Sequence, residues 1–166
     1  YLEYMPKAMI VGTTPEYTDV TGQSLERGRF ITEQDLETYR KVCILGYDIT
    51  REIFLKEDPI GKFVTIGGMR FRVVGIMKDK LKTKEKVKIK SRNTNRDVYI
   101  PITTSTKRFT MFMFESAREN KVTYGVVDEI TLKISSPEKL YEAKKALIKI
   151  LDRRHAGFKD YEITVP

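Results

Sequence analysis

Two adjacent glycines near the middle of the chain, Gly67 and Gly68, constrain its fold more than any other feature. They separate residues 63–66 from residues 69–77, two stretches rich in β-branched and aromatic side chains. A two-residue Gly-Gly connection is typical of a tight β-hairpin, because both turn positions need a positive φ angle that glycine adopts without steric cost. The sequence therefore predicts a hairpin here, and part of the domain must be a sheet.

Two short helices are expected before this hairpin. Residues 25–30 lead into the first helix, and Thr32 followed by Asp35 resembles a capping pair at its start. Asp48 is placed to cap the second helix. The apolar face of the second helix is formed by Ile49, Ile53 and Phe54. Helices and strands are thus expected to alternate in this part of the chain.

Further strands are predicted at residues 7–11, 41–45 and 98–101, which are short and mostly apolar. Residues 58–61, Asp-Pro-Ile-Gly, predict a turn, because proline pre-sets its φ angle and glycine tolerates the left-handed position. In the C-terminal third, apolar residues alternate at 130–134 and again at 161–165. The helix between them carries an apolar stripe of Leu140, Ala143, Leu147, Ile150 and Leu151. This part therefore predicts a strand–helix–strand unit.

No catalytic, cofactor or metal site is predicted. The glycines lie in turns and strands and form no phosphate-binding loop between a strand and a helix. His155, the one histidine, follows two arginines at an expected helix C-terminus, where a cationic ring suits the helix dipole. Cys43, the one cysteine, lies in an apolar run and is expected to be a buried, inert thiol. A small enzyme is therefore the least favoured hypothesis.

A lysine-rich segment carries much of the formal net charge of +8. Lysine occupies every second position at Lys78, Lys80, Lys82, Lys84, Lys86, Lys88 and Lys90. In an extended segment these side chains would all point to one side. Two interpretations stay open. The segment is either a solvated arm or edge strand that lysine protects against unwanted pairing, or a contact for anionic lipid or an acidic partner.

A second candidate contact is an apolar cluster that contains Phe109, Phe112 and Phe114 together with Met111 and Met113. It is either a partner-binding patch or a group buried under a loop or between subdomains. The basic charge also leaves an alternative function for the whole chain, a polyanion- or nucleic-acid-binding module. Single-strand binders interleave aromatic and basic residues, and residues 78–90 contain no aromatic residue. We therefore expect no nucleic-acid partner.

An ordered set of motifs runs from Leu25 to Pro101. It comprises Leu25-x-x-Gly28-Arg29-Phe30, Asp35, Val42-x-x-Leu45-Gly46, Ile53-Phe54, Asp58-Pro59-Ile60-Gly61-Lys62, Val64-x-Ile66-Gly67, Phe71-x-Val73-Val74-Gly75-Ile76 and Val98-Tyr99-Ile100-Pro101. This order and spacing resemble the extracytoplasmic domain of MacB-type ABC transporter permeases, the group that includes lipoprotein-release and FtsX-like permeases. In such domains, the glycines serve backbone geometry, and we expect Phe30, Phe54 and Phe71 in the core.

The resemblance implies an α+β fold in two parts. A porter-like, ferredoxin-like βαβ subdomain would comprise residues 1–12 and 100–166, with part of its layer preceding Tyr1. An inserted small α/β subdomain, often called the sabre, would comprise residues 13–99. The segment at 78–96 is longer and more basic than the family's loop at this point, so the resemblance gives no guide to its role.

The resemblance also implies a place and a role. No apolar run here reaches the roughly 18–20 residues of a membrane helix, and the family's domain lies outside the cytoplasmic membrane between two such helices. Its expected partners are the permease helices, an ATPase domain or subunit in the cytoplasm, a second copy in a homodimer, and a periplasmic adaptor. It would pass ATP-driven motion to a substrate or adaptor during export of drugs, peptides or lipoproteins, with no catalysis of its own.

Overall fold

The computed structural model describes residues 8–80, 93–107, 127–155 and 161–165. The chain divides into two compact units, Tyr1–Val127 and Asp128–Pro166, and each is described by itself. No helix in the described ranges is both long and apolar enough to cross a membrane.

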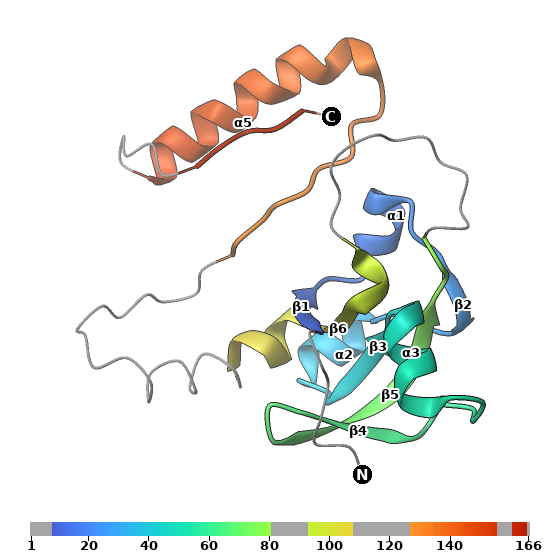
Figure 1. The fold of residues 1–166 in the computed structure, drawn as a ribbon. Coiled ribbons are helices and arrows are strands. Elements are labelled where there is room, and N and C mark those ends of the chain that lie inside the picture. The colour runs from blue at the N-terminus through green and yellow to red at the C-terminus, as the bar shows by residue number, and fades with distance from the viewer. Residues whose placement is uncertain (1–7, 81–92, 108–126, 156–160, 166) are drawn as a thin grey trace. The chain divides into compact units, whose positions relative to one another are not determined.

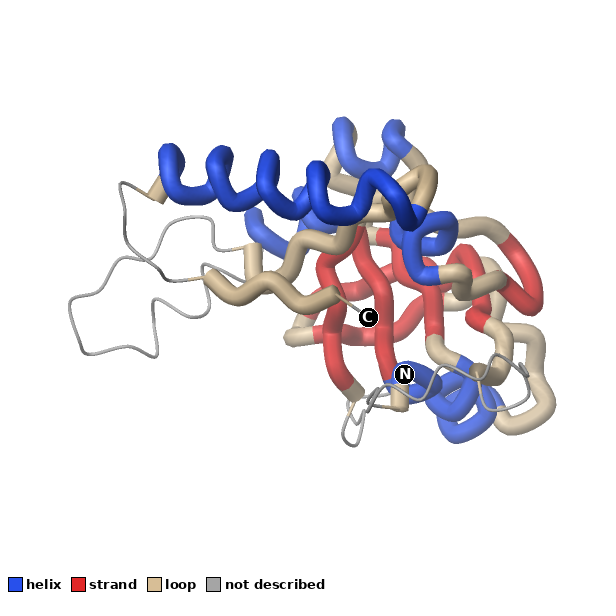
Figure 2. Tube along the Cα trace, turned by 90° about the horizontal axis from the view of Figure 1, so that it is seen from above, coloured by secondary structure: helices blue, strands red, loops and turns tan. Residues whose placement is uncertain are grey.

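The first unit is built on a mixed six-stranded sheet (Figures 1 and 2). The strands are β1 (Met9–Thr13), β2 (Leu25–Gly28), β3 (Val42–Leu45), β4 (Phe63–Ile66), β5 (Met69–Met77) and β6 (Asp97–Pro101). Their order is β1-β6-β3-β5-β2, and β4 also pairs with β5. The β1–β6 and β3–β5 pairs are parallel and the others antiparallel. The predicted α+β class is confirmed.

Both faces of this sheet carry an apolar cluster. On one face Cys43, Leu45, Val98 and Ile100 pack with Ile49 of α3 (Tyr47–Phe54). On the other, Ile44 and Tyr99 pack with residues of α1 (Tyr17–Thr21) and α2 (Glu33–Glu37). Side chains alternate between the two faces along each strand, so the apolar runs of β3 and β6 place core residues on both.

The predicted hairpin is confirmed. Gly67 and Gly68 have φ angles of 54° and 74° and join β4 to β5, with Ile66 opposite Met69. The expected core positions are confirmed for Phe30 and Phe71, which are buried. Phe54 is only partly buried at the edge of the α3-side cluster, because it ends α3 at the protein surface.

The start of β2 corrects one expectation. Residues 25–30 do not simply lead into a helix, because residues 25–28 pair with the second half of β5 while β4 pairs with the first half. At the end of β2, Gly28 has a φ angle of 79°, and Arg29 N–H donates to the Val74 carbonyl at 2.9 Å. A Cβ at Gly28 would overlap that carbonyl. The glycine at this position is therefore required by a close approach of two backbones.

Of the two predicted helix caps, the one at the start of α2 is confirmed and the one at the start of α3 is wrong. Thr32 and Asp35 form the predicted capping box at the start of α2. Asp48 is not the cap of α3, because that helix begins after Gly46 and no side chain caps it. A Cβ at Gly46 would overlap the Asn95 carbonyl, so the strand end and the helix start share one glycine. Asp48 lies in the first turn instead and accepts a hydrogen bond from Asn93 at 3.3 Å.

Cys43 is buried, as predicted, and burial raises the pKa of its thiol well above the usual value. We expect the native domain not to react with an aromatic disulfide reagent at pH 8, because the thiolate is the reactive form. The same thiol should react fully after unfolding in urea. Colour release measured with and without urea checks this, and rapid reaction of the native protein would contradict the burial.

The second unit contains η2 (Pro137–Lys139) and α5 (Leu140–Arg154). His155 lies at the C-terminus of α5, as expected, and donates its backbone N–H to Leu151 at 2.8 Å. The strands predicted at 130–134 and 161–165 are wrong for the described residues, which are irregular there. Alternation gives an extended chain one apolar side, but a strand also needs a neighbour for its backbone hydrogen bonds. Ile130 and Leu132 are accordingly exposed.

Candidate interaction surface

The contact residues predicted from the sequence lie mostly beyond the described ranges. Lys82, Lys84, Lys86, Lys88 and Lys90 and the phenylalanines Phe109, Phe112 and Phe114 all lie outside the described residues. Lys78 and Lys80 are described and exposed. Their backbone N–H groups donate to the Ser24 carbonyl at 2.9 Å and to the Asn95 side chain at 3.0 Å. Their role in binding stays a prediction.

The Asn95 side chain connects the two described ends of the lysine-rich region. It is buried, accepts from Lys80 N–H through Oδ1, and donates from Nδ2 to Asp79 at 2.8 Å. Its own N–H donates to the Asn93 side chain at 3.0 Å. Residues 79–80 are thereby fixed beside residues 93–95. This clamp was not predicted, because nothing local in the sequence pairs Asn95 with Asp79.

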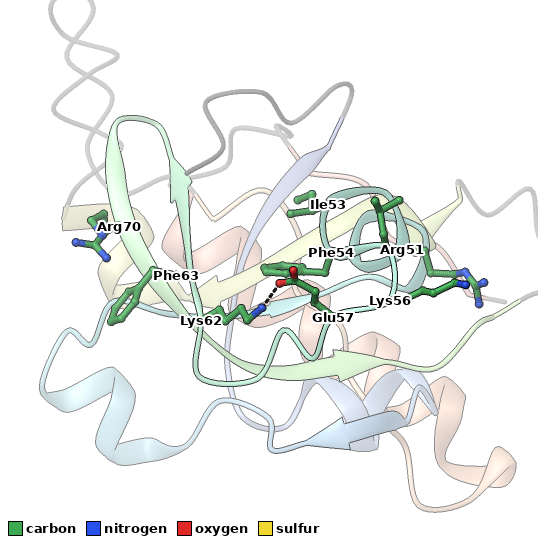
Figure 3. Close-up of a pocket in the computed structure, with 9 residues that line it drawn as sticks. Arg51, Ile53, Phe54, Lys56, Glu57, Lys62, Phe63 and Arg70 are labelled. Atoms are coloured by element: carbon green, nitrogen blue, oxygen red, sulfur yellow. Dashed lines mark hydrogen bonds and ion pairs between the residues drawn. The ribbon is translucent and has the colours of Figure 1, made fainter.

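A hollow of about 1040 Å³ lies between the end of α3 and the β4–β5 hairpin (Figure 3). We call it the basic hollow. It is lined by Arg51, Ile53, Phe54, Leu55, Lys56, Glu57, Lys62, Phe63 and Arg70. Four of these side chains are cationic and one is acidic. The sequence did not predict this group, because its members come from a helix, a loop and two strands and form no local pattern.

Cations and aromatic rings are paired in the basic hollow. The Arg70 guanidinium lies over the Phe63 ring, 4.7 Å from its centre, and Phe63 remains 49% exposed. The Lys62 ammonium lies 5.8 Å from the centre of the Phe54 ring. Such contacts hold a cation beside an apolar surface without neutralising its charge. The hollow therefore offers apolar area and positive charge together.

Glu57 is the one acidic side chain of the basic hollow, and it forms an ion pair with Lys62 (Figure 3). The hydrogen bond from Lys62 and its positive charge lower the pKa of the Glu57 carboxyl. The carboxylate is thus kept ionised and occupied. An arrangement of this kind is suited to binding an anionic group and holds no acid or base poised for proton transfer.

Leu55 stands out at the end of α3. Its φ angle is 51°, a region that side-chain-bearing residues occupy at a cost of about 1 kcal/mol or more, and the residue is 80% exposed. Hydrophobic burial of Leu55 therefore offsets almost none of the cost of this conformation. Leu55 is thus a strained and exposed residue at the rim of the basic hollow.

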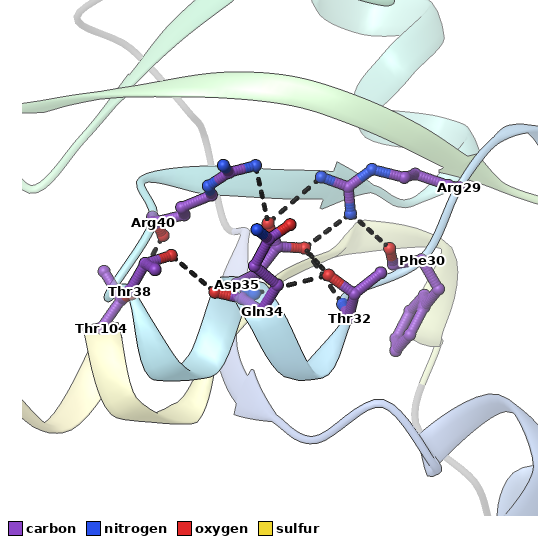
Figure 4. A network of polar contacts seen from close by, with 8 residues as sticks. All are labelled: Arg29, Phe30, Thr32, Gln34, Asp35, Thr38, Arg40 and Thr104. Atoms are coloured by element: carbon purple, nitrogen blue, oxygen red, sulfur yellow. Dashed lines mark hydrogen bonds and ion pairs between the residues drawn. The ribbon is translucent and has the colours of Figure 1, made fainter.

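A network of polar contacts around Asp35 lies on the face of the sheet opposite α3 (Figure 4). Asp35 is fully buried and accepts from both Arg29 nitrogens, at 2.6 and 3.1 Å, and from the backbone and hydroxyl of Thr32, at 3.0 and 2.9 Å. Arg40 lies 3.8 Å from the same carboxylate. Arg29 joins α2 to the end of β2, and Thr32 caps the start of α2. The group is satisfied internally, so we assign it to stability and not to binding.

No three histidine, cysteine or acidic residues gather as a metal site anywhere in the described part of the chain.

A model of the MacB-like periplasmic core domain matches residues 2–150. The chain belongs to this family. The match confirms the resemblance read from the motifs and places the chain on the outer side of a membrane, as a domain of an ABC transporter permease.

Relatives of this MacB-like domain are much longer proteins. The macrolide export ATP-binding/permease protein MacB of Mannheimia succiniciproducens is 31% identical over 153 residues, which cover 92% of this chain and 20% of the relative. The pyoverdine export ATP-binding/permease protein PvdT of Pseudomonas aeruginosa is 21% identical over 157 residues, 95% of this chain and 21% of that protein. The chain thus spans about a fifth of the length of the curated relatives it matches.

Two solved structures share the fold. The extracellular domain of the noncanonic ABC-type transporter YknZ from Gram-positive bacteria matches with a TM-score of 0.72 at 19% identity, over 99% of this chain and 74% of that one. The periplasmic region of MacB from Actinobacillus actinomycetemcomitans matches with a TM-score of 0.61 at 24% identity, over 89% and 56%. These matches support the fold of this MacB-like domain.

Proposed function

We propose that this domain passes ATP-driven motion from the membrane helices of its permease to an exported substrate or to a periplasmic adaptor. The observation that carries the proposal is the family match over residues 2–150, together with relatives named as export ATP-binding/permease proteins. In this proposal ATP is hydrolysed elsewhere in the transporter, and the domain itself catalyses nothing. The exported molecule is a small compound of the kind named for the relatives, a macrolide or a pyoverdine.

The build of the first unit supports a mechanical role. Its sheet has a core on both faces, and the Arg29–Asp35 ion pair fixes α2 to the strand end. A body packed in this way moves as a whole and does not deform continuously, because protein interiors are close-packed. A force applied at one end would therefore reach the other.

We further propose the two-part division into residues 1–12 with 100–166, porter-like, and residues 13–99, sabre-like. In that arrangement the extended stretches on either side of α5 would become strands by pairing with another part of the intact permease. The homodimer, the adaptor, and a contact of the lysine-rich segment with anionic lipid are proposed with it. The polyanion-binding alternative stays a prediction.

The proposal predicts a nucleotide-dependent movement of this domain in the intact transporter. We would introduce Glu37→Cys, an exposed position at the end of α2, attach a spin label, and replace other accessible cysteines. Cys43 can stay because it is buried. The distance between the labels of two copies, measured by pulsed electron resonance, should change between the nucleotide-free and vanadate-trapped states.

The unsubstituted transporter, treated with the same label, serves as the control for background labelling. The same distance distribution in every nucleotide state, in a variant that still hydrolyses ATP, would overturn the mechanical role. Absence of any inter-label distance would overturn the dimer.

A further inference from the structure

We propose that the basic hollow binds an acidic segment of a partner protein, with an apolar side chain of that segment seated against Phe54, Leu55 and Phe63. The proposal rests on the proposed function, in which the domain passes motion to a substrate or an adaptor on its own side of the membrane. It adds a place and a chemistry for that contact. It concerns residues 51–70, not the lysine-rich segment.

Charge gives the first argument. Arg51, Lys56 and Arg70 are exposed around the hollow, and because Glu57 pairs with Lys62, no acidic residue of the lining compensates the charge of these three. Complementary charge steers association and selects the partner. A segment with several carboxylates fits this rim, and a basic segment is repelled by it.

The geometry of Arg70 gives the second argument. Its guanidinium stacks over the Phe63 ring at 4.7 Å, and among the described residues it forms no ion pair. A stacked guanidinium keeps the N–H donors at its edge available, and these match a carboxylate in bidentate fashion. Interface energy concentrates where an aromatic or arginine anchor lies at the centre of a contact. Arg70 and Phe63 supply such a centre.

Leu55 gives the third argument. It has a positive φ angle and is 80% exposed, so the isolated domain gains little stability from having leucine there. A bound apolar side chain would cover Leu55 and the exposed part of Phe63 at once. The strain at this position is then explained by the complex and not by the free domain.

The shape of the site favours a protein segment over a lipid surface. Phe54, only partly buried, and Ile53 lie inside a hollow of about 1040 Å³ (Figure 3). A single side chain of a protein segment can enter such a hollow and contact Ile53 and Phe54. The flat surface of an anionic bilayer cannot. A bilayer would depend on Leu55 and the outer cations alone.

The test uses the 166-residue chain labelled with nitrogen-15 and three synthetic probes. The first is an acidic peptide of glutamates around one central leucine. The second has glutamine in place of every glutamate, and the third has alanine in place of the leucine. Amide signals of α3, β4 and β5 should shift on saturable binding of the first peptide in 150 mM salt, with at least tenfold weaker binding of the other two.

Variants then locate the site. Leu55→Ser, Phe63→Ser and Arg70→Gln should each weaken binding of the acidic peptide about tenfold. The chain offers a control in Tyr39 and Lys107: Tyr39 is exposed and has a positive φ angle, as Leu55 does, and the Lys107 ammonium lies 4.3 Å from the centre of its ring. Tyr39→Ser and Lys107→Gln should leave the affinity within twofold of the unsubstituted chain.

Three results would overturn the proposal: no saturable binding of the acidic peptide, equal loss in the control variants, or equal binding of the glutamine peptide. A fourth is binding to phosphatidylglycerol vesicles that needs Leu55 but no binding to the peptide, which would assign the surface to a membrane. None of these results touches the nucleotide-dependent label distance, so this inference and the mechanical role can fail separately.

Discussion

Replacing Gly28 with alanine should lower the free energy of unfolding by roughly 2–5 kcal/mol. Two costs combine at this position. The φ angle of 79° is unfavourable for alanine, at roughly 1–2 kcal/mol, and the added Cβ would overlap the Val74 carbonyl, at a further 1–3 kcal/mol or so for a forced backbone shift. Urea denaturation followed by circular dichroism gives the measurement.

Gly68→Ala is the matched control for this prediction. Gly68 also has a positive φ angle, 74°, but a Cβ there would meet no atom within 4 Å. It should therefore show the conformational cost alone, about 1 kcal/mol. The difference between the two variants isolates the close approach of the end of β2 to β5. Equal losses would mean that the two backbones are not in contact there.

Replacing Asp35 with asparagine should lower the free energy of unfolding by roughly 2–3 kcal/mol at pH 7. The carboxylate is fully buried and receives four hydrogen bonds. Bonds to a charged group contribute about 1.5–3 kcal/mol when one partner is lost. Larger losses seen for wholly buried pairs are not expected, because the Arg29 side chain is 43% exposed and solvent screens it.

The same variant should change how stability depends on pH. Burial raises the pKa of the Asp35 carboxyl, but the hydrogen bonds from Arg29 and Thr32 and the charge of Arg29 outweigh it, so the pKa lies below its usual value. A lowered pKa means that the folded state binds the proton less readily than the unfolded chain. The stabilisation is therefore complete above the unfolded pKa of about 3.9 and disappears as pH falls through the folded value.

The stability difference between the original chain and Asp35→Asn should thus be largest above about pH 5 and shrink below about pH 4. Asp58→Asn provides a control, because the Arg27–Asp58 ion pair is exposed on both sides. The hydrogen bonds from Ile60 N–H and Arg27 also lower the pKa of the Asp58 carboxyl. An asparagine oxygen can still accept from Ile60, and exposed pairs contribute little, so this variant should change the stability and its pH profile much less than Asp35→Asn does. A difference for Asp35→Asn that stays constant from pH 3 to pH 7 would contradict the ionised, paired carboxylate.

The sequence predicted the features that depend on neighbouring residues. The Gly67-Gly68 turn and the Thr32–Asp35 capping box are local, and both are confirmed. β2 was missed because its four residues are strand-forming only through pairing with β5. The two strands expected around α5 failed for the reverse reason, since alternation does not supply a pairing neighbour.

The candidate site shows the same limit. Charge and periodicity predicted a contact at the lysine-rich segment. They did not predict the basic hollow, because its residues come from α3, a loop and the hairpin. One signal for it was present in the predicted hairpin. Phe63 lies opposite Arg72, which puts Phe63 and Arg70 diagonally on one side of the two strands, within reach of each other. The end of α3, and the conformation of Leu55, had no such local signal.

The Asn95 clamp joins the described residues on either side of positions 81–92. Because the buried amide binds both Asp79 and Lys80, the residues that follow β5 are fixed beside the residues that lead into β6. Lengthening a closed loop is inexpensive, about 0.6 kcal/mol for each doubling. We therefore expect that a fluorescent reporter inserted between residues 80 and 93 of the intact permease would leave the stability of the first unit nearly unchanged.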